Sequence, residues 1–124
     1  MWDLVDNPDS IALIESFYNS GKPVAAVCRS PAVFHHVMYN GVPLVKGKRV
    51  TGFTNGEEEA VQLTHVVPFL VEDELLRLGA VFEKMANWQP FSITDGRLIT
   101  GQNPASSTSA AQALLKLMAS QKTT

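Results

Sequence analysis

The 124-residue sequence contains a single cysteine, Cys28, and little excess charge of either sign. One cysteine excludes an internal disulfide framework, so a reducing, cytoplasmic location is expected. Ten Lys and Arg residues against twelve Asp and Glu residues give a formal net charge of −2, which offers no electrostatic case for binding nucleic acid or an anionic membrane. No apolar run is long enough to span a bilayer, and no signal peptide is expected because Asp3 and Asp6 follow Met1 closely.

The lone cysteine lies at a predicted strand-to-helix turn. Residues 24–27 form a short apolar run typical of a buried strand, and Pro31 suits the first turn of a helix. A thiol at such a junction would lie beside free backbone N–H groups and the positive end of a helix dipole, which lower a cysteine pKa and stabilise an oxyanion. The alternative interpretation is a buried, inert cysteine that only packs.

The remaining pattern alternates strands with helices, which predicts one small α/β domain. Helices are expected at residues 9–19, 31–39, 57–63, 68–78 and 107–119, and strands at 24–27, 50–54, 81–85, 92–94 and 98–100. Asp95-Gly96 predicts a hairpin turn, and the strands at 81–85 and 92–94 are both expected to pair with the strand at 98–100.

Several side chains receive structural roles in this interpretation. Asn7 or Asp9 is expected to cap the first helix, and Asn103-Pro104 to turn the chain before the last one. The apolar residues expected to form the core and its anchors are Ile11, Leu13, Ile14, Phe17, Phe69, Leu70, Leu75, Leu78, Ala110, Ala113, Leu114, Leu117, Trp2 and Trp88, the two tryptophans serving as core or interface anchors.

Six segments follow one another in an order that resembles a known family. They are Val-Ala-Ala-Val-Cys at 24–28 and the stretches 41–55, 57–60, 67–74, 78–80 and 95–107. Together they resemble the ThiJ/PfpI family of the class I glutamine amidotransferase-like superfamily, nearest its glyoxalase III and chaperone-like branch. The resemblance implies a partial flavodoxin-like sandwich, a mostly parallel sheet with helices on both faces. It covers only the C-terminal half of the family's domain, so a single truncated domain over residues 1–124, without the N-terminal strands, is expected.

The resemblance also implies site residues. In the family, the thiolate at the Cys28 position is the nucleophile, the adjacent histidine moves protons, and a carboxylate orients that histidine. The motif maps the carboxylate onto Glu58, with Glu57 and Glu59 as close alternatives; all three also suit a solvated helix start. The histidine position holds Arg29, which cannot accept a proton at physiological pH and is free to pair with Glu58 instead.

The resemblance therefore predicts a protein of cofactor-independent glyoxalase III ancestry whose catalysis is impaired. Intact relatives would convert 2-oxoaldehydes to 2-hydroxy acids. A glutamate and a Gly-Gly-His-Gly loop of the family precede the segment that Met1–Leu4 resembles, and both are expected to be lacking. One alternative is a non-enzymatic, oligomeric binding or chaperone-like module. Amidotransferase or peptidase activity is less favoured, because its histidine has no counterpart beside Cys28.

Partners and metals follow from the same features. Half of a parallel sheet would expose a strand edge, so a homodimer is expected, with a small 2-oxoaldehyde as a possible ligand and neither nucleic acid nor membrane as partner. His35, His36 and His65 are candidate metal ligands by residue type, but adjacent histidines on a helix point about 100° apart. No metal or cofactor is expected, and His35 and His36 are assigned to the surface or to helix packing.

Overall fold

The structure is a computed structural model that describes residues 7–62, 64 and 69–122. Trp2 and His65 lie outside the described residues. The elements are, in order, α2 (Pro8–Asn19), β1 (Val24–Val27), the 3₁₀ helix η1 (Ser30–His36), β2 (Met38–Tyr39), β3 (Val42–Pro43), β4 (Arg49–Val50), α3 (Asn55–Ala60), α4 (Val71–Arg77), β5 (Val81–Phe82), β6 (Ser92–Asp95), β7 (Leu98–Gly101), the 3₁₀ helix η2 (Pro104–Ser106) and α5 (Ser107–Lys122).

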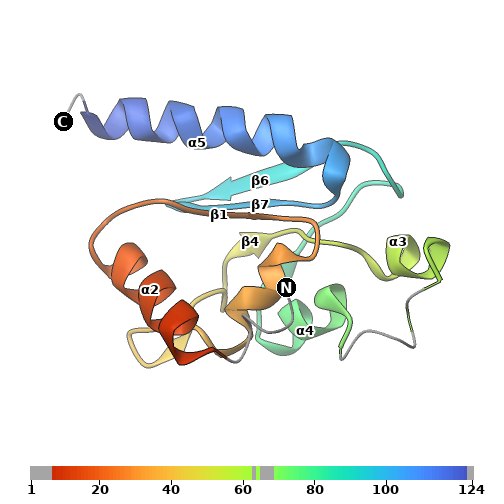
Figure 1. Cartoon of the computed structure of the whole chain (residues 1–124), viewed down its shortest axis with the longest axis horizontal. Helices are drawn as coiled ribbons and strands as arrows, with labels where there is room; N and C mark the ends of the chain where they lie inside the picture. The colour runs from red at the N-terminus through yellow and green to blue at the C-terminus, as the bar shows by residue number, and fades with distance from the viewer. Residues whose placement is uncertain (1–6, 63, 65–68, 123–124) are drawn as a thin grey trace.

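The largest sheet has the strand order β1-β7-β6. β1 runs parallel to β7, with Val24 opposite Leu98, and β6 is antiparallel to β7. Two smaller sheets pair β2 with β3 antiparallel and β4 with β5 parallel. Helix α5 covers one face of the main sheet, while α2, η1 and α4 lie beyond its other face (Figure 1). The predicted α/β, flavodoxin-like class is confirmed.

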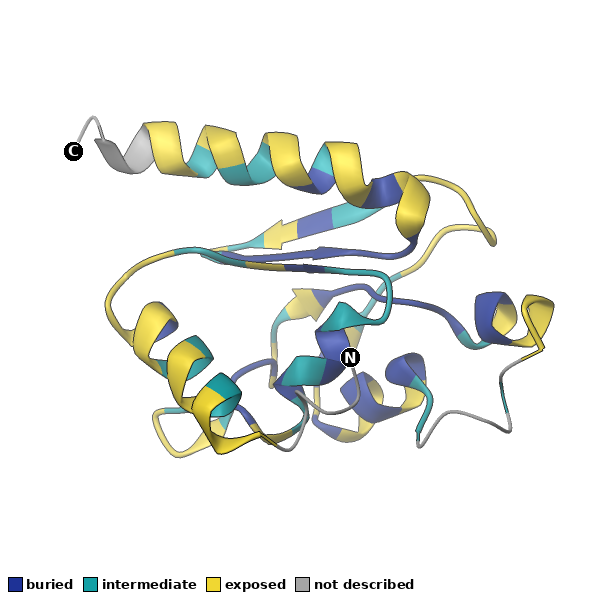
Figure 2. Cartoon of the chain, viewed as in Figure 1, coloured by how far each residue is buried: buried dark blue, intermediate teal, exposed yellow. Residues whose placement is uncertain are grey.

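The core lies on the side of the main sheet away from α5. Figure 2 shows buried positions gathered in β7, η1, α4 and the segment that follows β4, with exposed positions along the outer surfaces of α2 and α5. Phe34 from η1 and Leu98 from β7 are fully buried, and Leu75 from α4 is 2% exposed. No helix within the described residues is long and apolar enough to cross a membrane.

Helix α2 lies where it was predicted, but only some of the side chains predicted to face the core do so. The Asn7 side chain accepts hydrogen bonds from the N–H groups of Asp9 (2.9 Å) and Ser10 (3.1 Å), as an N-cap does. Ile11 and Ile14 pack against the core, but Leu13 and Phe17 are 64% and 43% exposed. The helix instead turns Tyr18 inward, where its ring packs edge-on against Tyr39 with centroids 4.9 Å apart.

The predicted helix at 31–39 is wrong in type and length. The segment forms the 3₁₀ helix η1, and Val37 ends it in an extended conformation (ψ 127°). The reason lies in the next turn: Asn40 and Gly41 both have positive φ (54° and 82°), the geometry of a two-residue hairpin loop. Residues 38–39 therefore pair with 42–43 as strands instead of continuing a helix.

The expected pairing of residues 81–85 with the 98–100 strand is also wrong. β7 already has β1 on one side and β6 on the other, so it has no free edge for β5. β5 pairs with β4 instead, and both are two-residue strands, shorter than the predicted 50–54 and 81–85. The β6–β7 hairpin around Gly96 is confirmed.

The other helices differ from expectation mainly at their ends. α3 begins at Asn55, earlier than the predicted 57, because Thr54 caps it. α4 covers Val71–Arg77 and is followed by Gly79 at φ 90°, the predicted stop, and α5 extends to Lys122. Trp88 is 41% exposed, so its predicted place in the core is wrong, while a role at an interface stays a prediction.

Candidate functional site

Cys28 forms a strained elbow at the carboxyl end of β1. Its φ is +65°, a conformation that costs a non-glycine residue about 1–3 kcal/mol. Two backbone hydrogen bonds maintain it: the Cys28 N–H donates to the Gly101 carbonyl (2.9 Å), and the Cys28 carbonyl accepts from the Phe53 N–H (2.8 Å). A Cβ on Gly101 would lie 3.1 Å from Val27 and from Ser106, so glycine permits the close approach of β7 to the elbow.

The residue after the cysteine is clamped by a buried carboxylate. The Arg29 guanidinium donates through Nε to Glu58 Oε2 (3.1 Å) and through Nη2 to Glu58 Oε1 (2.5 Å). The Glu58 side chain is 2% exposed and that of Arg29 is 29% exposed. The guanidinium carbon also lies 4.8 Å from the centroid of the Phe53 ring. Paired and stacked in this way, Arg29 is held in one orientation beside the thiol.

The three consecutive glutamates of α3 take separate positions. Glu58 binds Arg29, whereas the exposed Glu59 accepts a hydrogen bond from the Thr64 hydroxyl (2.7 Å). Glu57 is fully buried and accepts from the Trp88 N–H and from Asn103 Nδ2, each at 2.7 Å. Of the three carboxylates that the motif left open, the structure therefore brings Glu58 to the arginine beside the thiol.

Burial raises the pKa of Cys28 above its ordinary value. The Arg29 N–H and guanidinium oppose this by lowering the pKa, while the charges of Glu57 and Glu58 raise it further. The Arg29 N–H lowers the pKa of the thiol, as expected for a thiol beside free backbone N–H groups, but burial is the larger effect. The thiol is therefore mostly protonated at pH 7.

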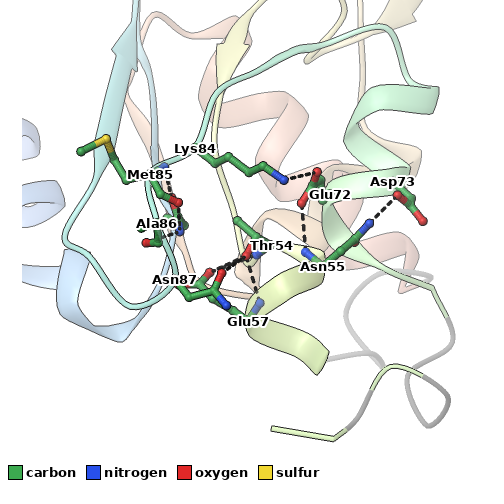
Figure 3. Close-up of polar contacts among 10 residues, drawn as sticks. Thr54, Asn55, Glu57, Glu72, Asp73, Lys84, Met85, Ala86 and Asn87 are labelled. Atoms are coloured by element: carbon green, nitrogen blue, oxygen red, sulfur yellow. Dashed lines mark hydrogen bonds and ion pairs between the residues drawn. The ribbon is translucent and has the colours of Figure 1, made fainter. Parts of the chain in front are cut away.

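The helix that carries Glu58 is held by polar contacts on several sides (Figure 3). Thr54 and Glu57 form a reciprocal capping box at its start. The Asn55 N–H donates to Glu72 Oε1 (2.9 Å) and Asn55 Nδ2 donates to Asp73 Oδ1 (2.9 Å), which joins α3 to α4. Glu72 also pairs with Lys84 Nζ at 2.9 Å. These contacts set the position of α3 and so of the Glu58 carboxylate.

Two buried polar residues of this region were not assigned such roles from the sequence. Gln102 is fully buried, accepts from the Met85 N–H (2.8 Å) and donates to the Met85 carbonyl (3.1 Å), so it fixes the segment after β5. Asn103, expected only to turn the chain, holds Glu57 and the Gln89 carbonyl (2.8 Å). The proline after Asn103 indicated a turn but not the hydrogen bond to Glu57. No local sequence feature indicates the role of Gln102.

Of the paired histidines, His35 packs against Glu74 and Phe69, whereas His36 is exposed. His35 Nδ1 lies 3.2 Å from Glu74 Oε2, and its ring stacks on Phe69 with centroids 4.8 Å apart. The rings of His35 and His36 lie 4.0 Å apart. No group of three or more His, Cys, Asp and Glu side chains within the described residues is arranged to hold a metal ion.

No family model matches the chain, but comparisons with known proteins find relatives of similar sequence and fold. The glutathione-independent glyoxalase HSP31 of Saccharomyces cerevisiae is 36% identical over 118 residues, which are 90% of this chain and 50% of the relative. The crystal structure of glyoxalase III from Candida albicans superposes with a TM-score of 0.88 at 30% identity, over 93% of this chain and 51% of that one. A two-domain protein of Anabaena variabilis with a DJ-1/ThiJ/PfpI-like domain matches 94% of this chain and 26% of its own, with a TM-score of 0.68 and 25% identity.

The chain belongs to the ThiJ/PfpI family. It spans about half the length of the curated relatives it matches, and it fits the C-terminal half of the ThiJ/PfpI fold. Those relatives carry the name glyoxalase, which agrees with the glyoxalase III branch of the ThiJ/PfpI family suggested by the motifs.

The buried Glu57 generates a prediction about acid stability in this ThiJ/PfpI chain. Burial alone would raise the pKa of Glu57, but hydrogen bonds from Trp88, Asn103 and Thr54 outweigh it and place the pKa below the ordinary value. A lowered folded-state pKa contributes stability above the unfolded value of about 4.3, and that contribution is lost as the pH falls through the folded value. Glu57→Gln should therefore cost about 1.5–3 kcal/mol at pH 7 and progressively less below about pH 4.

Urea unfolding of the Glu57→Gln protein and the parent between pH 3 and 7 measures this effect. Glu59→Gln, on the same helix but exposed, is the matched control and should follow the parent curve throughout. A Glu57→Gln penalty that stays constant down to pH 3 would contradict the assignment.

The thiol environment generates a second prediction, read from the pH dependence of Cys28 alkylation by iodoacetamide. The parent midpoint should lie above the ordinary thiol value of about 8.5, because burial disfavours the thiolate. Arg29→Gln should move the midpoint upward, since it removes the nearby positive charge. Glu59→Gln should leave it unchanged, and a parent midpoint near 7 would show that the elbow activates its thiol after all.

Proposed function

We propose that this chain carries a glyoxalase III-type cysteine site in which proton transfer is disabled, so that 2-oxoaldehydes are bound through Cys28 but turned over poorly. The observation that carries the proposal is the two-point pair between Arg29 and Glu58 beside a thiol of raised pKa. Its support in ancestry is the set of relatives named glyoxalase, of whose length this chain matches about half.

The chemistry explains why the arginine matters. Conversion of a 2-oxoaldehyde to a 2-hydroxy acid through a thiohemiacetal forms a C–S bond to the aldehyde carbon, moves a proton from that carbon to its neighbour, and ends with hydrolysis of the thioester. A side chain must accept and return that proton. Guanidinium has no acceptor atom and keeps its charge, and the pairing with Glu58 raises the pKa of Arg29 further. The carboxylate that would orient a base is occupied by the same pair.

Formation of the thiohemiacetal does not need the missing base, because no proton moves between the two carbons in this step. A thiol adds reversibly to an aldehyde, and a fixed cation beside the thiol favours the thiolate form that attacks. Arg29 lies next to Cys28 in the chain, and its charge lowers the pKa of the thiol. The site as built therefore supports reversible capture of a small carbonyl compound and not its isomerisation.

A second candidate function, a non-enzymatic binding module, is favoured by one surface feature. An apolar groove lies between α2 and the start of β1, lined by Leu13, Ile14, Phe17, Pro23 and Val24. Leu13 and Phe17 are among the exposed large apolar side chains. The two candidates separate on Cys28→Ala, which abolishes carbonyl capture and leaves a groove-based function unchanged.

The proposal predicts a gain of function. Arg29→His restores a group able to move protons beside the thiol, and general acid–base catalysis contributes about 10²–10⁴-fold to rate. We expect the parent protein to form lactate from methylglyoxal no faster than Cys28→Ser, and Arg29→His to exceed it by at least about 100-fold.

Two controls complete that experiment. Arg29→Lys preserves the charge without a base of suitable pKa and should stay inactive, and the double variant Arg29→His, Cys28→Ser should lose the gain. Parent turnover that disappears in Cys28→Ser would show that Arg29 does not disable the site.

A further inference from the structure

Trp88 has a strained backbone conformation close to the elbow. Its φ is +67°, an uncommon value for a bulky residue and nearly the same as the +65° of Cys28. The Trp88 N–H donates to Glu57 Oε2 at 2.7 Å, and Asn103 Nδ2 donates to that same oxygen at 2.7 Å. Strain of this kind persists only where the surroundings enforce it, and such positions cluster at active sites and ligand clamps. The buried Glu57 therefore fixes the backbone from which the indole projects.

The Trp88 ring contacts the aromatic residue that also stacks on the arginine. Its centroid lies 5.7 Å from that of Phe53 in an edge-on arrangement. The same Phe53 ring lies 4.8 Å from the Arg29 guanidinium carbon, and the Phe53 N–H donates to the Cys28 carbonyl at 2.8 Å. Phe53 is buried, whereas Trp88 is 41% exposed. Of these two rings, the indole is the one with surface to offer a ligand.

The charges around the thiol favour a neutral ligand. The Arg29 guanidinium already donates to both oxygens of Glu58. The negative charges of Glu57 and Glu58 both act on the Cys28 thiol, whose pKa they raise. A ligand that carries a carboxylate would meet these charges with the guanidinium already paired. A ligand with an aromatic substituent avoids that repulsion and gains the contact that two rings make with each other.

We propose that Trp88 determines which carbonyl compounds this site accepts, by packing its indole on the aryl group of an aryl 2-oxoaldehyde captured at Cys28. The inference rests on the proposed capture function and names its ligand class. In the capture step the thiol adds across the aldehyde C=O bond: a C–S bond forms, the thiol proton passes to the carbonyl oxygen, and no group leaves.

The size of the substituent decides how much Trp88 contributes. In an aryl 2-oxoaldehyde the ring lies beyond the second carbonyl carbon, so it extends away from the sulfur and presents a full aromatic face. The methyl group of methylglyoxal at the same place offers little surface for packing on an indole. Aromatic pairs are worth more than their buried area alone, and a ring whose backbone is already fixed loses little freedom on binding. The indole therefore favours the aryl compound.

The test measures how well phenylglyoxal, methylglyoxal and glyoxylate protect Cys28 from alkylation by iodoacetamide. The half-protecting concentration of each aldehyde is divided by its value for N-acetylcysteine, which removes differences in intrinsic reactivity. The parent should favour phenylglyoxal over methylglyoxal by at least about fivefold, and glyoxylate should protect least. Trp88→Ala should abolish the preference for phenylglyoxal, and Trp88→Phe, which keeps a ring, should retain most of it. Leu115→Ala, which shortens another exposed apolar side chain, is the matched control and should keep the parent preference.

A second measurement does not depend on the folding of Trp88→Ala. In Trp2→Phe, Trp88 is the one tryptophan of the chain, and phenylglyoxal should quench its fluorescence unless Cys28 is also replaced by serine. Intact mass after dilution should return to the starting value, because a thiohemiacetal dissociates whereas an adduct on arginine persists.

The outcomes separate this inference from the capture function beneath it. An equal preference in the parent and in Trp88→Ala overturns the inference, because an indole that only packs on Phe53 would affect stability and not selectivity. A parent that captures all three aldehydes without favouring phenylglyoxal, or that favours glyoxylate, also overturns it and leaves the capture function standing. A Cys28 that no aldehyde protects refutes the capture function, and this inference with it.

Discussion

The buried carboxylate of Glu58 is the constraint on which the site depends. A carboxylate withdrawn from water needs a cation or several donors close by, and here one guanidinium meets both of its oxygens. That requirement fixes Arg29, and Arg29 in turn lies over Phe53, whose N–H holds the carbonyl of Cys28. The strained elbow, the ion pair and the aromatic ring are therefore parts of one arrangement.

Two adjacent glutamates of α3, Glu57 and Glu58, connect this arrangement to the rest of the fold. Glu57 faces inward, where Trp88 and Asn103 hold it and tie α3 to the segments around β5 and β7. Glu58 faces the elbow. Successive residues of a helix point about 100° apart, so one short helix serves both purposes. Asn55 also joins this helix to α4 by two hydrogen bonds. The position of the Glu58 carboxylate therefore depends on contacts of α3 with several other segments of the domain.

What the sequence predicted correctly is local. The cap at Asn7, the strand at Val24–Val27 and the Gly96 hairpin depend on residues close together in the chain, and all three are confirmed. The pairing of β5 and the outward position of Phe17 depend on which surfaces remain free after distant segments have packed. A local sequence pattern contains no information about those surfaces. The pKa of the thiol is another such property: its largest cause is burial, and the sequence left a buried, inert cysteine open only as an alternative. Likewise, the motif mapped the carboxylate onto Glu58 with Glu57 and Glu59 as alternatives, and only the fold shows that the phase of α3 brings Glu58 to Arg29.

A double-mutant cycle on Arg29→Gln and Glu58→Gln tests most directly the claim that these side chains act as one locked pair. Contacting charged groups typically show coupling of 0.5–3 kcal/mol, and partial exposure of Arg29 reduces the value by solvent screening. Measured as free energies of unfolding at pH 7, the cycle should give a coupling of about 1 kcal/mol or more that decreases with added salt. Additive effects of the two substitutions would mean that Arg29 is not held by Glu58 and that the elbow is free to work in another way.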